Sequence, residues 1–406
     1  MEDEYCEEVH VDDDEVFSSD SDIMEEEAEP AEDDNDTSFF SAQLPDSALC
    51  VAISTADPFI SCVGCLDNSA RLFQVDAVGA PQQSAQLLGH TDSVASVSFS
   101  SHGGLVATGS YDGTIKLWSA IGGETFGEEI CTIDETSSDI ESLMWHPDGL
   151  VLVCGCADGS IWVWDILPTG DHTLKYMMNG HSHGSPVRSL HFLGKHSSEL
   201  LSTSEEGVAI VWNLATGQVI HKTQPFAEPI SSASVHPNKP VYALGLENGW
   251  TYVMHAQSGK QLHKMKTTGD AGSVEAVSFS NCGQLLAAAT INGVLEIWHM
   301  DHLGGHPRHR IDKSGRTDED ADMVGFTKLV WHPDSSLRCL ISGGKAGEVD
   351  VWNAMTGEHL TGLAGHSADV LDLAMTQFQD PQGRSVARVV SVCDEGFIKM
   401  FTVSQE

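Results

Sequence analysis

Residue types that commonly carry acid–base chemistry stand close together in one early segment. "GHTDSVASVSFSSHGGLVATGSYDGTIKLW" (89–118) contains His90, Thr108 and Asp112 and ends on Trp118. A histidine held by a carboxylate is the pair that general acid–base catalysis uses. Taken alone, this set would suggest an enzyme.

The same residue types recur along the chain, and this recurrence argues against catalysis. Asp158 and Trp164 lie in "ADGSIWVW", and Trp212 ends "EEGVAIVW". A buried imidazole needs partners for its polar atoms, and an aspartate at a turn provides one. We therefore expect a structural network, most complete in the second and third units, and no catalytic residues. The expected network comprises His90, Thr108, Asp112, Trp118, Asp158, Trp164, His181, Trp212 and His366.

When the repeats are aligned on the last residue of this pattern, the chain contains eight units. They end at Phe73, Trp118, Trp164, Trp212, Met254, Trp298, Trp352 and Phe401, with spacings of 45, 46, 48, 42, 44, 54 and 49 residues. Gly-His precedes three units, at 89–90, 180–181 and 365–366. Gly-His, short alternating strands, an Asp-Gly turn and a final Trp are typical of WD40 blades. The sequence predicts an all-β fold, an eight-bladed WD40 β-propeller.

The two ends of the chain differ in composition. Residues 1–36 contain 19 Asp and Glu and no Lys or Arg, which predicts a disordered acidic tail. Residues 37–406 are expected to form the propeller. The last unit, 368–402, has no outer strand after it, and "SFFSAQL" (38–44) aligns with the outer-strand segment 82–88. We expect 38–44 to complete the last blade and to remove its open edge.

Charge limits the possible partners. The formal net charge is −40; with 19 acids in the tail, 41 acids and 20 bases remain in 37–406, a net charge of −21. Such a field repels nucleic acid and anionic membranes and attracts basic proteins. We expect a monomer that binds a basic protein, with no direct nucleic-acid binding, no membrane contact and no cofactor.

The cysteines lie mostly in apolar runs, which is typical of reduced thiols in a cytoplasmic or nuclear protein. The lone C-x-x-C pair, Cys62 and Cys65, has no second pair beside it, so we expect no metal.

A propeller presents its loops around the central channel, and seven acids precede or begin the predicted first strands. They form either a ring that binds a Lys/Arg-rich partner or an ordinary part of an acidic surface. These candidate partner-binding residues are Asp46, Asp92, Asp139, Glu141, Glu228, Glu275 and Asp369.

Two further segments allow two interpretations each. The insert 299–320 is rich in His and Arg and is either a solvated loop, which we favour, or a metal or contact site. In the tail, Ser18, Ser19 and Ser21 lie among acids, as in substrates of acidophilic kinases, but the tail is equally consistent with an unmodified solubilising segment.

Three segments carry a narrower resemblance. "MWHPDGLVLVCGCADGSIWVWDILPTGD" (144–171), "LTGLAGHSADVLDLAM" (360–375) and 89–118 are similar to blades of the angio-associated migratory cell protein family, and the resemblance covers roughly 37–403. The fungal branch of that family is a chaperone that delivers a basic ribosomal protein of the L-ten family to the large subunit. The animal branch is associated with cell migration and signalling.

The resemblance and the charge lead to the same expectation. We expect a dedicated chaperone that captures a basic ribosomal protein on an acidic propeller face. The alternatives are a scaffold in signalling or cell migration and a histone-binding propeller.

Overall fold

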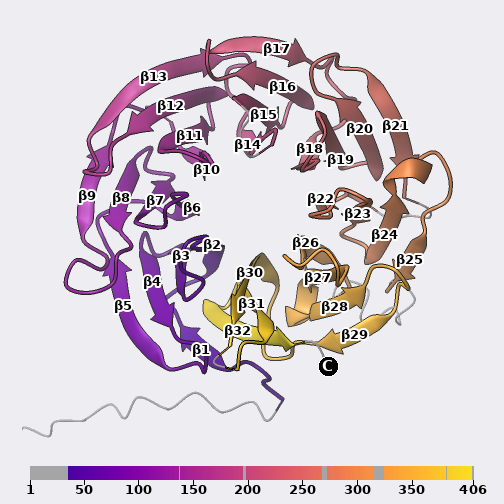
Figure 1. Ribbon diagram of the computed structural model, residues 1–406. Helices are drawn as coiled ribbons and strands as arrows, with labels where there is room; N and C mark the ends of the chain where they lie inside the picture. Colours follow the sequence, from indigo (N-terminus) through magenta and orange to yellow (C-terminus); the bar gives the residue numbers. More distant parts are fainter. Residues whose placement is uncertain are drawn as a thin grey trace, which may run out of the picture. The chain divides into compact units, whose positions relative to one another are not determined.

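Eight four-stranded antiparallel sheets stand around a central axis like the blades of a propeller (Figure 1). The computed structural model describes residues 35–136, 138–194, 198–267, 272–313, 324–380 and 382–404. The predicted tail and its serines Ser18, Ser19 and Ser21 therefore lie outside the described residues, except for Asn35 and Asp36. The chain from Asn35 onward forms one unit. The predicted eight-bladed propeller is confirmed.

Every blade is built in the same order from the axis outward. The innermost strands are β2 (Ala48–Ile53), β6 (Val94–Phe99), β10 (Ile140–Trp145), β14 (Val187–Phe192), β18 (Ile230–Val235), β22 (Ala276–Phe279), β26 (Phe326–Trp331) and β30 (Val370–Gln379). The second strands are β3 (Ile60–Cys65), β7 (Leu105–Ser110), β11 (Val151–Cys156), β15 (Glu199–Ser204), β19 (Val241–Leu246), β23 (Leu285–Ala289), β27 (Cys339–Gly344) and β31 (Ser385–Cys393).

The third strands carry the final aromatic residue of each repeat. They are β4 (Ala70–Val75), β8 (Ile115–Ser119), β12 (Ser160–Ile166), β16 (Val208–Asn213), β20 (Trp250–His255), β24 (Val294–His299), β28 (Val349–Asn353) and β32 (Phe397–Ser404). The outer strands are β5 (Pro81–Leu87), β9 (Glu129–Ile133), β13 (His172–Asn179), β17 (Gln218–Lys222), β21 (Gln261–Lys266), β25 (His309–Asp312), β29 (His359–Gly362) and β1 (Phe40–Gln43). Among the described residues, two short 3-10 helices lie in loops: η1 (Met300–His302) and η3 (Lys345–Gly347).

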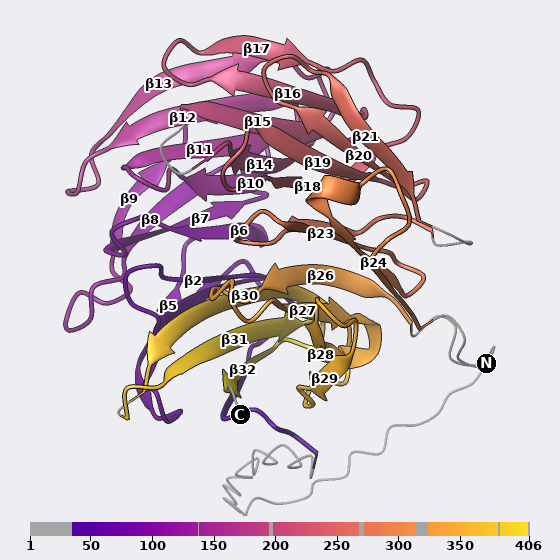
Figure 2. The same ribbon diagram turned by 45° about the vertical axis from the view of Figure 1, so that its right-hand side comes forward.

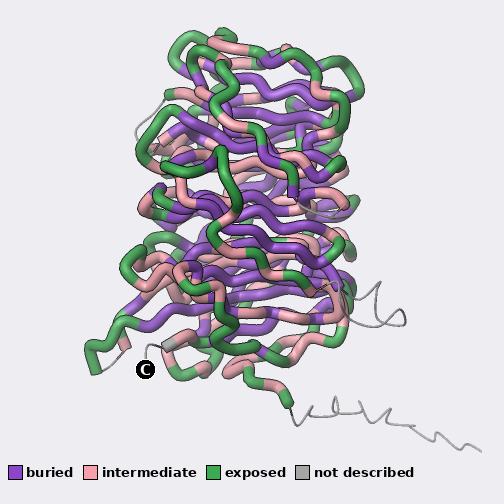
Figure 3. The backbone as a smooth tube through the Cα atoms, turned by 90° about the vertical axis from the view of Figure 1, so that its right-hand side faces the viewer, coloured by how far each residue is buried: buried purple, intermediate pink, exposed green. Residues whose placement is uncertain are grey.

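The core lies between neighbouring blades, which explains why each unit repeats the same apolar pattern. Leu72 of the first blade and Val94 and Phe99 of the second belong to one buried cluster. In the tube view, buried strand interiors alternate with exposed loops at the two ends of the ring (Figure 3). A four-stranded sheet cannot bury both of its faces alone, so each blade depends on its neighbours for stability.

The ring closes through strands from both ends of the propeller. β1 pairs antiparallel with β32, from Phe40 opposite Met400 to Gln43 opposite Phe397 (Figure 1). This is the pairing that the sequence predicts for 38–44. Two backbone bonds extend it, from Phe39 N to Met400 O (3.0 Å) and from Leu44 N to Gly396 O (2.7 Å).

The expected tail boundary at residue 36 is wrong by two residues. The Asp36 carboxylate forms an ion pair with Lys399 Nζ, and Thr37 N donates to Ala364 O at 2.9 Å. Asn35 and Asp36 therefore belong to the propeller, because a charge partner on β32 fixes this part of the chain.

A buried arginine reinforces the closure between the eighth and first blades. Arg388 on β31 is 1% exposed and donates to Val75 O (2.8 Å) and Asp76 O (2.5 Å). Its guanidinium lies 5.1–5.3 Å from the ring centres of Phe39, Phe59 and Phe378. Among the described residues, no carboxylate hydrogen-bonds to this guanidinium, and burial lowers its pKa to about 10.

The expected loop at 299–320 is wrong in part. His309–Asp312 form β25, the outer strand of the sixth blade, with Arg310 opposite Glu296. The blade requires a fourth strand, and Ile311 packs inward on its neighbours while His309 Nε2 meets Met355 O at 2.6 Å. Residues 314–320 of the insert lie outside the described residues.

Candidate partner-binding face

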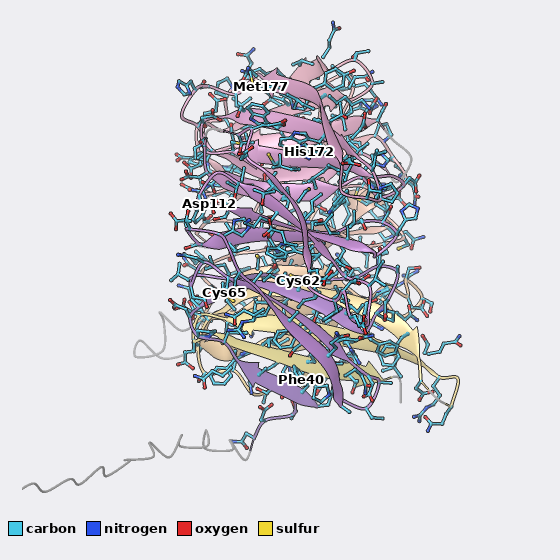
Figure 4. The ribbon with its side chains drawn as sticks, turned by 90° about the vertical axis from the view of Figure 1, so that its left-hand side faces the viewer. Phe40, Cys62, Cys65, Asp112, His172 and Met177 are labelled. Carbon is cyan, nitrogen blue, oxygen red and sulfur yellow. The ribbon has the colours of Figure 1, made fainter. Side chains whose placement is uncertain are left out.

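The set that resembles an acid–base site is a buried structural network. His90 Nδ1 lies 3.0 Å from Asp112 Oδ2, and His90 Nε2 lies 2.8 Å from Thr108 Oγ1. Trp118 Nε1 donates to the same hydroxyl at 2.9 Å. Gly113 follows Asp112 (labelled in Figure 4) and takes φ +77°, which the turn requires and which glycine adopts without strain. Both imidazole nitrogens are occupied, so this histidine is not available to a substrate.

Other blades contain parts of this network, but the blades in which it is most complete are not the second and third, as the sequence predicts. In the fourth blade, Ser202 Oγ meets His181 Nε2 (2.7 Å) and Trp212 Nε1 (2.8 Å), so the second and fourth blades are the most complete. In the eighth blade, His366 Nε2 meets Ser391 Oγ at 2.6 Å, and the final Phe401 adds no donor.

The third blade replaces the histidine by a carboxylate. Trp164 Nε1 donates to Glu135 Oε2 at 2.6 Å, and Glu135 Oε1 lies 3.9 Å from His172 Nε2 (labelled in Figure 4). Asp158 accepts from Ser160 N and Oγ and makes no bond to Trp164. Asp158 thus accepts hydrogen bonds at the turn, as Asp112 does in the second blade, and its contribution to the network is made through Ser160.

Acid is expected to destabilise the propeller through these histidines. Burial lowers the pKa of His181 and of His366 to about 4. An unfolded histidine titrates near 6.5, so the stabilisation is complete above about pH 6.5 and is lost as the pH falls toward 4. Urea unfolding should show a free energy lower by a few kcal/mol at pH 5 than at pH 7.5. His181→Gln should reduce that difference, whereas His102→Gln, at an exposed site, should leave it unchanged. Equal pH dependence in all three proteins would contradict the assignment.

The seven predicted acids gather at one end of the ring, which we call the upper face. It is the end at which the eight innermost strands begin. Asp46, Asp92, Asp139 and Glu228 are exposed and precede β2, β6, β10 and β18. Glu141, Glu275 and Asp369 are half-buried and lie at the starts of β10, β22 and β30. The repeated architecture therefore brings all seven acids to one surface around the channel.

Some of these carboxylates also hold local structure. Asp46 Oδ1 accepts from Ser47 N (2.8 Å), and Asp92 Oδ1 accepts from Ser93 N (2.7 Å). Asp369 Oδ1 accepts from Ala346 N at 3.1 Å. Asp139, Glu228 and Glu275 have no such bond from the described residues.

The upper face already holds one guanidinium between two carboxylates. Arg188 Nη1 lies 3.0 Å from Glu141 Oε2, and Arg188 Nε donates to Glu205 Oε1 at 2.8 Å. Burial raises the pKa of Glu141, while Arg188 acts against that shift. In the channel, Lys328 Nζ lies 2.8 Å from Asp372 Oδ1, which raises the pKa of the lysine. Both cations are neutralised by the protein itself, so they do not cancel the other acids.

Three further upper-face acids were missed by the sequence reasoning. Glu205, Glu247 and Asp394 directly follow the second strands β15, β19 and β31. They are the first letters of "EEGVAIVW", "ENGWTYVM" and "DEGFIKMF". The sequence therefore marked these three acids, because each is the first residue of the repeat pattern, directly before its turn.

Apolar side chains lie on one part of the upper face. Leu66 is 45% exposed on the first blade, and Leu49 and Leu371 are half-buried on the first and eighth blades. They lie on the same blades as Asp46, Asp369 and Asp394, whereas the third to sixth blades carry Glu141, Glu205, Glu228, Glu247 and Glu275. The upper face thus has carboxylates around the ring and leucines among them on the first and eighth blades.

A metal site finds no support. In the described ranges, no three His, Cys, Asp or Glu side chains are placed to hold a metal ion. Cys62 and Cys65 lie buried on β3 with free thiols (Figure 4). Among these residues, no helix has the length and apolar character to cross a membrane.

The chain is an eight-bladed β-propeller that carries WD40 repeats. The family model "WD domain, G-beta repeat" matches residues 81–119, 127–165 and 259–299. The chain is homologous to two kinds of protein. It is 24% identical to the human angio-associated migratory cell protein over 92% of this chain and 81% of that protein. It is 26% identical to the ribosome assembly protein SQT1 of Saccharomyces cerevisiae over 97% of this chain and 91% of that protein.

Solved structures agree on the fold. The crystal structure of Saccharomyces cerevisiae Sqt1 has a TM-score of 0.79 at 24% identity and covers 91% of this chain and 100% of that one. Sqt1 of Chaetomium thermophilum, bound to the N-terminus of the ribosomal protein L10, has a TM-score of 0.74 at 19% identity, covering 91% and 100%. The expected resemblance is thereby confirmed.

Proposed function

We propose that this protein is a chaperone that captures a basic ribosomal protein of the L-ten family on its upper face for assembly of the large ribosomal subunit. The observation that carries the proposal is the gathering of carboxylates on that face, where Arg188 and Lys328 are already paired. Homology to a yeast ribosome assembly protein and the fold of an L10-bound Sqt1 support it.

The physical role of the face follows from its charge. A nascent basic protein exposes Lys and Arg that attract RNA and other polyanions. Carboxylates around a rigid ring can cover these groups without rearrangement, which limits the entropy cost of binding. The leucines of the first blade, Leu66 and Leu49, would receive one apolar side chain of the client and fix its register.

The same proposal includes the absence of catalysis and the location. The acid–base residues are used in structural networks, so we propose a non-enzymatic, cofactor-free monomer. We place it in the cytoplasm, where ribosomal proteins are made, and also in the nucleus.

Binding of the client should depend strongly on salt. Calorimetry with an N-terminal peptide of ribosomal protein L10 should show an affinity at least tenfold weaker at about 300 mM than at about 50 mM salt, since screening weakens exposed charge pairs. The same affinity at both concentrations would contradict a charge-based interface.

Purification of the tagged protein from its own cells tests the proposal without choosing the client. Mass spectrometry should find one basic ribosomal protein in near-equal amount. Recovery of histones, or of signalling proteins without any ribosomal protein, would instead support the histone-binding or scaffold function.

A further inference from the structure

The outer surface of the fifth and sixth blades is basic, although the protein as a whole is strongly acidic. Residues 255–266 and 299–313 contain six of the 20 Lys and Arg and six of the 20 His, but only two of the 60 Asp and Glu. They include the outer strands β21 and β25, which are neighbours on the ring (Figure 1). We call this surface the basic wall.

Several cations of the basic wall have no acidic partner. Arg310 pairs with Asp312 (2.7 Å), and Lys313 pairs with Glu348 (2.5 Å). By contrast, within the described part of the chain, four others form no ion pair with a carboxylate: Lys260, Lys264, Lys266 and Arg308. All four are exposed. In a protein with 60 acids, unpaired neighbouring cations mark a surface that can attract an anion.

Aromatic rings lie directly beside two of these lysines. On adjacent strands, Lys264 stands opposite Tyr252 and Lys266 stands opposite Trp250. Lys264 Nζ lies 4.0 Å from the centre of the Trp250 ring and 5.0 Å from that of Tyr252. Phe226 continues the row, 4.7 Å from Tyr252. Ammonium groups beside partly exposed rings are the combination that single-stranded nucleic acids use, for phosphate contact and base stacking.

A hollow of about 440 Å³ extends the wall onto the sixth blade. It is lined by His299, His302, His306 and Arg308. Met265 of β21 and Leu303, after η1, share one core cluster, which holds this loop against β21. Figure 2 shows the short orange helix η1 beside β21. A guanidinium in the hollow disfavours a metal cation, whereas the imidazole N–H groups beside it can donate hydrogen bonds to phosphate oxygens.

We propose that the basic wall binds single-stranded RNA, with Lys264, Lys266 and Arg308 contacting phosphates and Trp250 and Tyr252 contacting bases. The expectation of no nucleic-acid binding came from the net charge, which averages over the chain and does not describe a local surface. An acidic peptide would engage the ammonium groups but leave the rings unused, so the rings favour RNA. The inference is independent of the proposed client on the upper face.

The test uses the full chain and fluorescence anisotropy with an unstructured RNA of about 20 nucleotides at low salt. The variant Lys264→Glu/Lys266→Glu should weaken RNA binding at least tenfold. The slope of log affinity against log salt should fall by about 1.4, as expected for the loss of two phosphate contacts. Trp250→Ala should also weaken binding, through the lost stacking.

The matched control is Lys175→Glu/Arg384→Glu, which makes the same change in net charge at two exposed sites elsewhere. It should bind RNA within about twofold of the wild-type protein. No RNA binding by the wild-type protein, or an equal loss in the control, would overturn the proposal. A glutamate peptide of similar length that binds as tightly as RNA would overturn it in favour of an acidic protein partner.

Discussion

Replacing Arg388 with alanine is expected to lower the free energy of unfolding by about 4 kcal/mol. The side chain is almost fully buried, and its removal leaves a cavity among Phe39, Phe59 and Phe378. It also leaves Val75 O and Asp76 O without their donors. An unsatisfied buried carbonyl costs roughly 1–3 kcal/mol, and this loss adds to the lost packing.

Urea unfolding followed by tryptophan fluorescence would measure this effect. Arg384→Ala is the matched control: it removes an arginine four residues earlier, where the side chain is 75% exposed, pairs with Asp380 and donates to Gln382 Oε1. That change should cost less than about 0.5 kcal/mol. Arg388→Met keeps much of the volume and should show an intermediate loss. If Arg388→Ala unfolded at the same urea concentration as Arg384→Ala, the ring closure would not depend on this guanidinium.

Neutralising four upper-face acids is expected to weaken client binding on the order of 50-fold. The variant combines Asp139→Asn, Glu141→Gln, Glu228→Gln and Glu275→Gln. Each exposed charge pair contributes about 0.2–1 kcal/mol, so four of them amount to roughly 2–3 kcal/mol. Calorimetry with the L10 peptide measures the change, and thermal unfolding confirms that the ring remains folded.

A control variant with the same change in net charge distinguishes a binding site on the upper face from an effect of the protein's total charge. Glu124, Glu128, Asp171 and Glu358 are exposed and lie in connections between third and outer strands, at the opposite end of the ring. Their neutralisation should change client affinity less than about threefold, through long-range electrostatics alone. Equal losses in the two variants would mean that the acids act only by total charge.

The repeat pattern predicts the fold because each blade needs the same apolar positions. The turn residues, the final aromatic and even the pairing of 38–44 follow from that requirement. By contrast, the sequence did not predict β25 within the His- and Arg-rich insert. This segment forms a strand by pairing with β24, where Arg310 lies opposite Glu296. The place of Glu135 in the third blade was equally hidden, since a carboxylate there bonds directly to Trp164 where the second blade uses histidine and threonine.

The sequence predicted where the acids of the upper face lie, but not which cations they pair with. Strand starts locate the seven acids on one face, yet Arg188 joins Glu141 and Glu205 from three different strands or turns. Arg388 gives no sequence signal, because its partners are backbone carbonyls about 313 residues away in the chain. The basic wall was not predicted as one surface for another reason: Lys260, Lys264 and Lys266 belong to the fifth blade and Arg308 to the sixth.

The pairing of β1 with β32 sets the order in which the protein can be completed during synthesis. Phe40 pairs with Met400, so β1 remains unpaired after it leaves the ribosome until the 360 residues after Phe40, up to Met400, have been synthesised. Until then the eighth blade is incomplete, because β1 is its outer strand. A chain whose synthesis has not passed β32 therefore cannot present a complete ring to a client, and binding activity appears only after that strand has left the ribosome.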